Sequence, residues 1–338
     1  MSRRNILLFT GLALLLLAVL MLQLLLGSVS IPLSQIVSIL AGNEPEQEVW
    51  NSIILQSRFP AALAALVAGA GLSVSGLQMQ TLFRNPVAGP YVLGISSGAS
   101  LGVAVFILAA SSLGYSQLHL LRSWNIILAA GAGAVLIFLI NFLISSRLSD
   151  VVAILIVGLM IGGGISALIE ILQAFSSNEA LKRYVLWSFG SFRYVDTDQI
   201  NYLTGAVLAG SVFSFFLSKP LNLLLMGDTY ALSSGLDVSK AKMLIVLCTS
   251  VLAGSITAFC GPIGFVGLAV PHIARALFHT ADHKILTPAA MMIGAVICGL
   301  CNVIASTPGS DYVLPINAVT SLLGAPIVIW IIIRQKKY

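Results

Sequence analysis

Charged residues are scarce in this chain of 338 residues, at 9% of the sequence, whereas a soluble globular protein carries about 25%. Hydrophobic residues make up 58%. These proportions exclude an ordinary soluble domain. A membrane-crossing helix needs roughly 20 mostly apolar residues, because lipid offers no partner for unpaired backbone polar groups. The sequence therefore predicts an all-α, polytopic membrane protein with a single transmembrane domain over residues 1–338.

Acidic residues are nearly absent from the predicted membrane interior. The exception is Glu170, near the outer end of one predicted span. Ion-driven carriers usually keep ionisable groups at this depth for the coupling ion, and a membrane-embedded hydrolase would need a carboxylate pair, a metal cluster or an activated nucleophile. Both classes are disfavoured, and an ion-coupled secondary transporter remains the main alternative. We expect a transport protein, not an enzyme, with an external energy source.

Cysteine is also rare, and the few cysteines stand in apolar surroundings. Cys298 and Cys301 have the spacing of a redox or metal motif, yet neither has a polar flank or a nearby histidine. Core packing is the better interpretation. The four cysteines are Cys248, Cys260, Cys298 and Cys301.

The remaining polar groups build neither a nucleic-acid surface nor a metal site. The net charge of +5 comes from single basic residues in apolar sequence, without aromatic residues between them. His272, His279 and His283 lie near one predicted helix end with Arg275 and Asp282, but their spacing does not fit a compact ligand set. We expect solvated charge at this helix end.

Hydropathy and helix-breaking residues predict about ten spans. The division at 261–262 is the weakest, because no polar loop separates the two apolar runs, so nine spans stay open on hydropathy alone. The first run resembles a signal peptide but is too long for one, so we expect a retained helix. The predicted spans are 6–27, 61–83, 91–110, 124–144, 151–174, 199–217, 242–260, 262–278, 288–306 and 314–333.

The positions of the basic residues favour ten spans over nine. With both termini in the cytoplasm, all but five of the 17 lysines and arginines lie inside, as the positive-inside rule requires. Nine spans would place the two termini on opposite sides. We expect a multi-pass protein of the bacterial inner membrane. The five outer residues are Arg58, Arg122, Lys182, Arg183 and Arg193.

Small residues recur in two of the predicted spans. In the second span they occupy every fourth position from Ala61 to Ser73, which predicts close packing against other helices. In the fifth span Gly158, Gly162 and Gly163 would suit a smooth translocation surface, although close packing explains them equally well.

Residues 219–239 predict a helical hairpin on the cytoplasmic side. The first helix contains 221–226, Gly227 makes the turn, and Asp228 caps a second helix that ends at Gly235. An apolar-faced hairpin suits docking into a partner's groove. An amphipathic loop resting on lipid headgroups fits the same residues.

Two similar glycine–proline pairs, called breaks here, interrupt the apolar sequence of the chain. Each is followed by glycine-rich apolar sequence, and under the ten-span topology the two begin on opposite membrane faces, as in an inverted repeat. Chance similarity is the alternative. Before the first break, Asn85 and Pro86 end the second span and fix a tight re-entry. The breaks are Gly89-Pro90 with Gly94, and Gly261-Pro262 with Gly267.

Four stretches of the chain resemble the FecCD family of permeases, the subunits of importers for ferric siderophores, haem and cobalamin. The last stretch includes Pro271, His272 and Arg275. The four are RFPAALAALVAGAGLSVSGLQMQTLFRNPVAGPYVLGISSGASLG at 58–102, WSFGSF at 187–192, the hairpin at 220–238, and GPIGFVGLAVPHIAR at 261–275 with LGAPIVIW at 323–330.

The resemblance implies ten helices per subunit and a homodimer with the pathway on its two-fold axis. We expect this dimer to work by alternating access. The resemblance also implies two cytoplasmic ATPase subunits, which carry ATP and Mg, and an outer substrate-binding protein to which selectivity is attributed, while this chain binds no cofactor. By the same likeness 219–239 is the hairpin that couples to the ATPase. Its coupling residues would be Leu221, Leu225, Met226, Gly227, Asp228, Ala231, Leu232 and Gly235.

The family pattern also implies arginines that meet the binding protein at the outer start of the second span. Arg58 stands at that place, whereas Ala61 replaces the second arginine. Lys182, Arg183 and Arg193 are the basic residues that would compensate.

Overall fold

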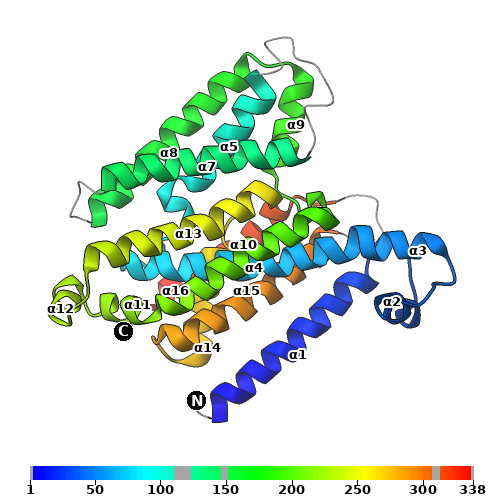
Figure 1. Ribbon diagram of the computed structural model, residues 1–338, viewed down its shortest axis with the longest axis horizontal. Coiled ribbons are helices and arrows are strands. Elements are labelled where there is room, and N and C mark those ends of the chain that lie inside the picture. Colours follow the sequence, from blue (N-terminus) through cyan, green and yellow to red (C-terminus); the bar gives the residue numbers. More distant parts are fainter. Residues whose placement is uncertain (1–2, 110–122, 146–150, 307–312, 336–338) are drawn as a thin grey trace.

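The structure is a computed structural model that describes residues 3–109, 123–145, 151–306 and 313–335. Every regular element within these residues is a helix (Figure 1). The α-helices are α1 (Arg3–Leu25), α2 (Leu33–Leu40), α3 (Glu48–Ser52), α4 (Phe59–Leu82), α5 (Ile95–Ala104), α7 (Ser123–Ser145), α8 (Val151–Ala174), α9 (Asn178–Ser188), α10 (Thr197–Phe216), α11 (Ser218–Leu225), α12 (Asp228–Ser233), α13 (Val238–Cys260), α14 (Val266–Phe278), α15 (His283–Ala305) and α16 (Ile316–Gln335).

Each of the ten predicted spans coincides with an apolar helix, but not every helix has full membrane length. Among the described residues, six helices are long and apolar enough to cross a membrane, or seven if α10 and α11, bent by 54°, count as one. The predicted spans at 91–110, 262–278 and 314–333 are shorter apolar helices. The length-based count is therefore lower than ten.

Backbone breaks explain two of these shorter helices. Residues 90–93 form a 3₁₀ turn and Gly94 has a φ of +67°, so α5 begins only at Ile95. Gly261 has a φ of +76°, and α14 begins only at Val266. Glycine takes such positive φ values without the steric cost that a side chain brings.

The helix α4 lies at the centre of the bundle and is buried along almost its whole length. It packs against α15, α13, α14 and α10. A methyl group added to Gly69 would overlap the backbone carbonyl of Gly294 in α15, and one added to Gly76 would overlap that of Gly267 in α14. This contact between backbones confirms the prediction that small residues pack the second span closely.

A buried glutamine ties α4 to two further helices. Gln78 donates from Nε2 to the hydroxyl of Ser214 in α10 at 2.9 Å, and its Oε1 accepts from the hydroxyl of Thr249 in α13 at 2.8 Å. All three side chains are buried. Hydrogen bonds of this kind hold helices together where lipid provides no hydrophobic driving force between them.

The first glycine–proline break packs directly against the second. His272 in α14 donates to the carbonyl of Pro86 at 2.7 Å, and Pro90 lies 2.9 Å from where a methyl group on Gly267 would stand. The segment 86–90 therefore runs antiparallel along α14. The Asn85 side chain accepts from the Val87 backbone N–H at 3.0 Å, which confirms the predicted tight turn.

The start of α1 and the end of α16 lie at the end of the bundle that carries α11 and α12, called here the hairpin end (Figure 1). Arg4 donates to the carbonyl of Phe278 at 2.7 Å, next to the α14–α15 turn that contacts α11. At the opposite end Asn317, in the first turn of α16, donates from its backbone N–H to the carbonyl of Phe189. The helix α16 therefore ends at the hairpin end.

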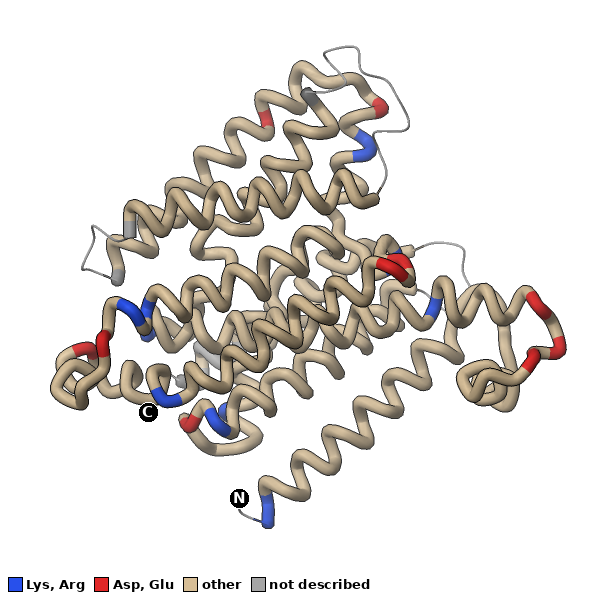
Figure 2. Tube along the Cα trace, in the orientation of Figure 1, with Lys and Arg blue, Asp and Glu red and all other residues tan. Residues whose placement is uncertain are grey.

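The charged residues gather at the two ends of the bundle and leave its middle apolar (Figure 2). At the hairpin end, basic residues outnumber the acidic Asp228, Asp237 and Asp282. The opposite end carries more acidic than basic residues, including three glutamates between α2 and the start of α3. The basic residues of the hairpin end are Arg3, Arg4, Arg84, Lys219, Lys240, Lys242, Arg275 and Lys284.

Replacement of Gly294 by alanine tests the close contact between α4 and α15. The added methyl group would overlap the Gly69 carbonyl and the Ser73 side chain, and overpacking of this kind costs typically about 1–3 kcal/mol. We expect Gly294→Ala to lower the midpoint of thermal unfolding in detergent.

Gly131→Ala in α7 is the matched control, because its added methyl group meets nothing within 4 Å. Alanine is up to about 1 kcal/mol better than glycine inside a helix, so this variant should be neutral or more stable. An unchanged midpoint for Gly294→Ala would contradict the packing described above.

Candidate functional site

The predicted hairpin at 219–239 is present as α11 and α12. The two helices meet at Gly227, whose φ of +110° makes the sharp turn between them. Asp228 is the first residue of α12 and Gly227 stands at the N-cap, so the prediction of Asp228 as the cap is wrong. The helix ends at Ser233, and Gly235, with a φ of +81°, turns the chain toward α13.

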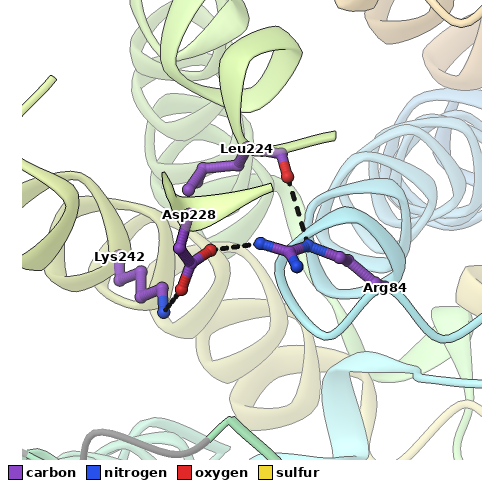
Figure 3. Close-up of polar contacts among 4 residues, drawn as sticks. All are labelled: Arg84, Leu224, Asp228 and Lys242. Carbon is purple, nitrogen blue, oxygen red and sulfur yellow. Dashed lines mark hydrogen bonds and ion pairs between the residues drawn. The ribbon is translucent and has the colours of Figure 1, made fainter. Parts of the chain in front are cut away.

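The Asp228 carboxylate fixes α12 to the bundle instead of capping it (Figure 3). One oxygen pairs with the Arg84 guanidinium and the other lies 2.6 Å from Lys242 Nζ in α13. Arg84 also donates from Nε to the carbonyl of Leu224 at 3.2 Å, in the last turn of α11, where a cation is favoured. These groups are partly exposed, so each ion pair contributes at most about 1 kcal/mol. Together they connect four helices.

A second, buried network holds α11 against α4 and α15. Asn222 donates from Nδ2 to the Asp282 carboxylate at 2.7 Å, and its Oδ1 accepts from the backbone N–H and from the ring Nδ1 of His283. Because an amide oxygen only accepts, Nδ1 carries a proton. The other ring nitrogen lies 2.8 Å from the Thr81 hydroxyl of α4. His283 is buried, so this network makes α11 part of the bundle.

The prediction of solvated charge at this helix end holds for His279, which is exposed, but is wrong for His272, His283 and Arg275. His272 and His283 are buried, and Arg275 donates to the Gln80 side chain at 2.6 Å. The apolar sequence around them gave no sign of these partners, which come from α4 and from the segment that follows it. Within the described residues, no three histidine, cysteine or carboxylate side chains gather as a metal site.

The exposed surface of the hairpin carries large apolar side chains that have no partner within the described chain. Met226 is 69% exposed, Leu232 is 59% exposed and Leu225 is 38% exposed. By contrast, Leu221 and Ala231 are buried, so these two members of the predicted coupling set anchor the hairpin and cannot contact a partner. The hairpin thus presents a rigid apolar surface at the basic end of the bundle.

The glycines predicted for the translocation path fall into two groups. A methyl group on Gly158 would overlap the carbonyl of Val92, so Gly158 serves close packing. Gly162 makes only an ordinary contact, 3.6 Å from the Ser97 hydroxyl, and Gly163 has open space around it. The side of α8 that has open space around it begins at these residues. Their role in a translocation path stays a prediction.

The residues predicted to dock a binding protein differ in whether their side chains are free to contact a partner. Arg58 donates to the carbonyls of Leu24 at 2.6 Å and of Val29, at and beyond the end of α1. Its guanidinium therefore caps a neighbouring helix, and this occupies the group that was expected to meet a partner. Ala61 is buried. Exposed basic groups at this end are Lys182, Arg183 and Arg193.

Comparison with known proteins places this geometry in a family. The profile of the FecCD transport family matches residues 15–334, nearly the whole chain. The chain belongs to the FecCD transport family. It is accordingly a permease subunit of an ATP-binding cassette (ABC) importer, a transport component without catalytic activity of its own, as predicted.

Relatives and solved structures agree with this membership. The vitamin B12 import system permease proteins BtuC of Salmonella typhi and Salmonella newport are 37% identical over 284 residues, which is 84% of this chain and 84% of each relative. A metal-chelate type ABC transporter in an inward-facing conformation superposes with a TM-score of 0.84 at 29% identity, over 97% of this chain and 99% of that one. PsaBC of Streptococcus pneumoniae shares the fold, with a TM-score of 0.54 at 14% identity.

Replacement of Asn222 by alanine should loosen α11 from the bundle. It removes the acceptor of the backbone N–H and of the ring Nδ1–H of the buried His283, and one donor to Asp282, and a buried polar group left unpaired costs about 1–3 kcal/mol. We expect faster hydrogen exchange throughout α11. Asn201→Ala in α10 is the control, because its amide makes only a 3.4 Å bond on an exposed surface. Equal exchange in both variants would exclude the anchoring role.

The Asp282 carboxylate gives the same anchor a pH dependence. The hydrogen bond from Asn222, and then that from the Lys284 backbone N–H, lower the pKa of Asp282. A lowered folded-state pKa adds stability that is full above the unfolded value of about 3.9 and is lost as the pH falls through the folded value. We expect protection of α11 against exchange to decline in that acid range, and Asp282→Asn to decline less. Identical profiles would contradict this.

Proposed function

We propose that this chain is the membrane-spanning subunit of an ATP-driven importer of a metal chelate, and that α11 and α12 receive the motion of the ATPase. The observation that carries the proposal is the hairpin itself. Its exposed residues Met226 and Leu232 are apolar, while Asp228 and Asn222 bind it rigidly to the bundle. A surface that is apolar and held rigidly suits a partner that binds to it and transmits motion through it. Membership of the FecCD family supports the same role.

The charged residues at the two ends of the bundle support an arrangement of the partner subunits. Two ATPase subunits with ATP and Mg would dock at the hairpin end, and a substrate-binding protein would dock at the opposite end, near Lys182, Arg183 and Arg193. The excess of basic residues at the hairpin end supports a cytoplasmic location for that end and for both termini, in the bacterial inner membrane. The exposed apolar side chains of α8 support a homodimer surrounded by lipid.

The hairpin would act as a lever because its anchors join it to the core. Asp228 links α12 to the end of α4 and to α13. Asn222 links α11 to α15, whose His283 contacts Thr81 of α4. Movement of the hairpin would therefore move these helices as a unit. Alternating access then needs the helices near the two-fold axis to part on one face and close on the other. The cargo is a metal chelate such as vitamin B12, the substrate of the BtuC relatives, a ferric siderophore or haem.

The test is chelate uptake by the complete importer in proteoliposomes. We expect uptake to require ATP and to persist when the proton gradient is dissipated. Uptake that stops without a proton gradient while ATP is constant would overturn the proposal in favour of an ion-coupled carrier.

Replacement of Gly227 by valine tests the lever. The φ of +110° at this position is strained for any side chain and most of all for a β-branched one. We expect Gly227→Val to retain the membrane-embedded fold and the ATPase partner but to lower the chelate transported per ATP several-fold. Gly205→Val in α10, which also has open space around its Cβ but lies in a helix, is the control. Wild-type coupling in Gly227→Val would refute the hinge.

A further inference from the structure

A cavity of about 430 Å³ lies between α5, α8 and α9 at the end of the bundle opposite the hairpin. Serines of α5 line one side, Ser166 and Glu170 of α8 line another, and Tyr184 of α9 lies beside them. The cavity adjoins the open side of α8, since Gly163 and Gly164 on the same helix have nothing within 4 Å of an added methyl group. A polar cavity beside an open helix face in an apolar bundle is unusual and indicates a functional site.

The Glu170 carboxylate is the one charged group among the described residues that line this cavity. The part of the chain that the structure describes gives it no ion pair and no hydrogen bond, and the side chain is exposed. None of the described lining residues is basic. An unpaired carboxylate in a concave, partly apolar site makes the local potential negative.

The hydroxyl groups of the cavity add hydrogen-bond acceptors to this negative charge. Ser166 donates its proton to the carbonyl of Gly162 at 3.1 Å, so its oxygen remains free to accept. Ser96 shares a proton with Thr257 at 3.2 Å, and Ser100 is bonded to Tyr184. These hydroxyl oxygens can accept from a ligand, while the Tyr91 hydroxyl, which has no hydrogen-bond partner among the described residues, can donate to one. Hydrogen bonding alone therefore gives no preference, and Glu170 supplies the net charge of the cavity.

We infer that this cavity is a charge filter on the path of the cargo. It favours an uncharged or cationic chelate, such as a corrinoid or a ferric hydroxamate. It disfavours a chelate with net negative charge, such as a ferric catecholate or haem. Glu170 is the residue that sets the preference, by repulsion of anionic cargo as in acidic rings of cation channels. This inference rests on the proposed function and adds to it a part played by the permease in selectivity.

The experiment compares two probes of similar structure and different charge. Cyanocobalamin is uncharged, and its monocarboxylic acid, in which one amide is hydrolysed, carries one negative charge. If the importer does not carry corrinoids, a linear ferric trihydroxamate with a free amine and its N-succinyl derivative form the alternative pair, which differs by two charges. The initial rate of ATP-driven uptake of each probe is measured with the complete importer, and the ratio of the two rates is compared between permease variants. The binding protein is the same throughout, so a changed ratio belongs to the permease.

The variants are Glu170→Gln and Glu170→Lys, with Glu179→Gln as the matched control. Glu179 lies in the first turn of α9 at the same end of the bundle but does not line the cavity. We expect the preference for the less negative probe to fall about tenfold in Glu170→Gln, as a single charge at about 8 Å implies at intermediate dielectric, and further in Glu170→Lys. The control should stay within twofold of the wild type.

Unchanged ratios in both Glu170 variants, with uptake preserved, would overturn the charge filter and leave the importer function intact. An equal loss of preference in Glu179→Gln would also overturn it, since general surface charge would then explain the effect. Absence of ATP-driven uptake of either pair by the wild-type importer would overturn the proposed function and this inference with it.

Discussion

Contact between backbones along α4 is the constraint on which the rest of the structure depends. The helix approaches α14 at Gly76 and Gly267 and α15 at Gly69 and Gly294, closer than any side chain permits. Lipid supplies no hydrophobic force between helices, so such packing and a few buried hydrogen bonds must hold the bundle. Because α4 is fixed in this way, the Thr81 hydroxyl and the Arg84 guanidinium at its end are fixed too. The hairpin is anchored to both groups, and its rigidity follows from the packing of α4.

Much of this fold was predictable, because membrane helices are encoded by length and hydropathy alone. The spans at 124–144, 151–174 and 242–260 match α7, α8 and α13 closely, and Gly227 was placed correctly at the turn of the hairpin. Apolar runs and glycine turns are local signals. The positions of breaks within apolar sequence are not, so α5 and α14 were predicted too long.

The partners of polar residues could not be predicted, because they come from segments far apart in the chain. His283 meets Asn222 and Thr81, and His272 meets Pro86, across more than 60 positions of sequence in each case. The sequence left these histidines as solvated groups, and it assigned Arg58 to a partner protein although the end of α1 binds it. The only signal for Asn222 was one polar residue inside the apolar run 221–226. Long-range hydrogen bonds depend on how the helices pack against one another, and no local sequence pattern contains this information.

The most direct test of the central claim is site-specific cross-linking from the hairpin. A cysteine placed at Met226 can be joined to lysines of a neighbouring subunit, and the native cysteines within the described residues are buried, so they do not compete. The account predicts that Met226→Cys forms an adduct with the ATPase in the transport-competent complex. Val37→Cys, in the exposed α2 at the opposite end, should form none. A complex that transports chelate while Met226→Cys yields no ATPase adduct would contradict the account.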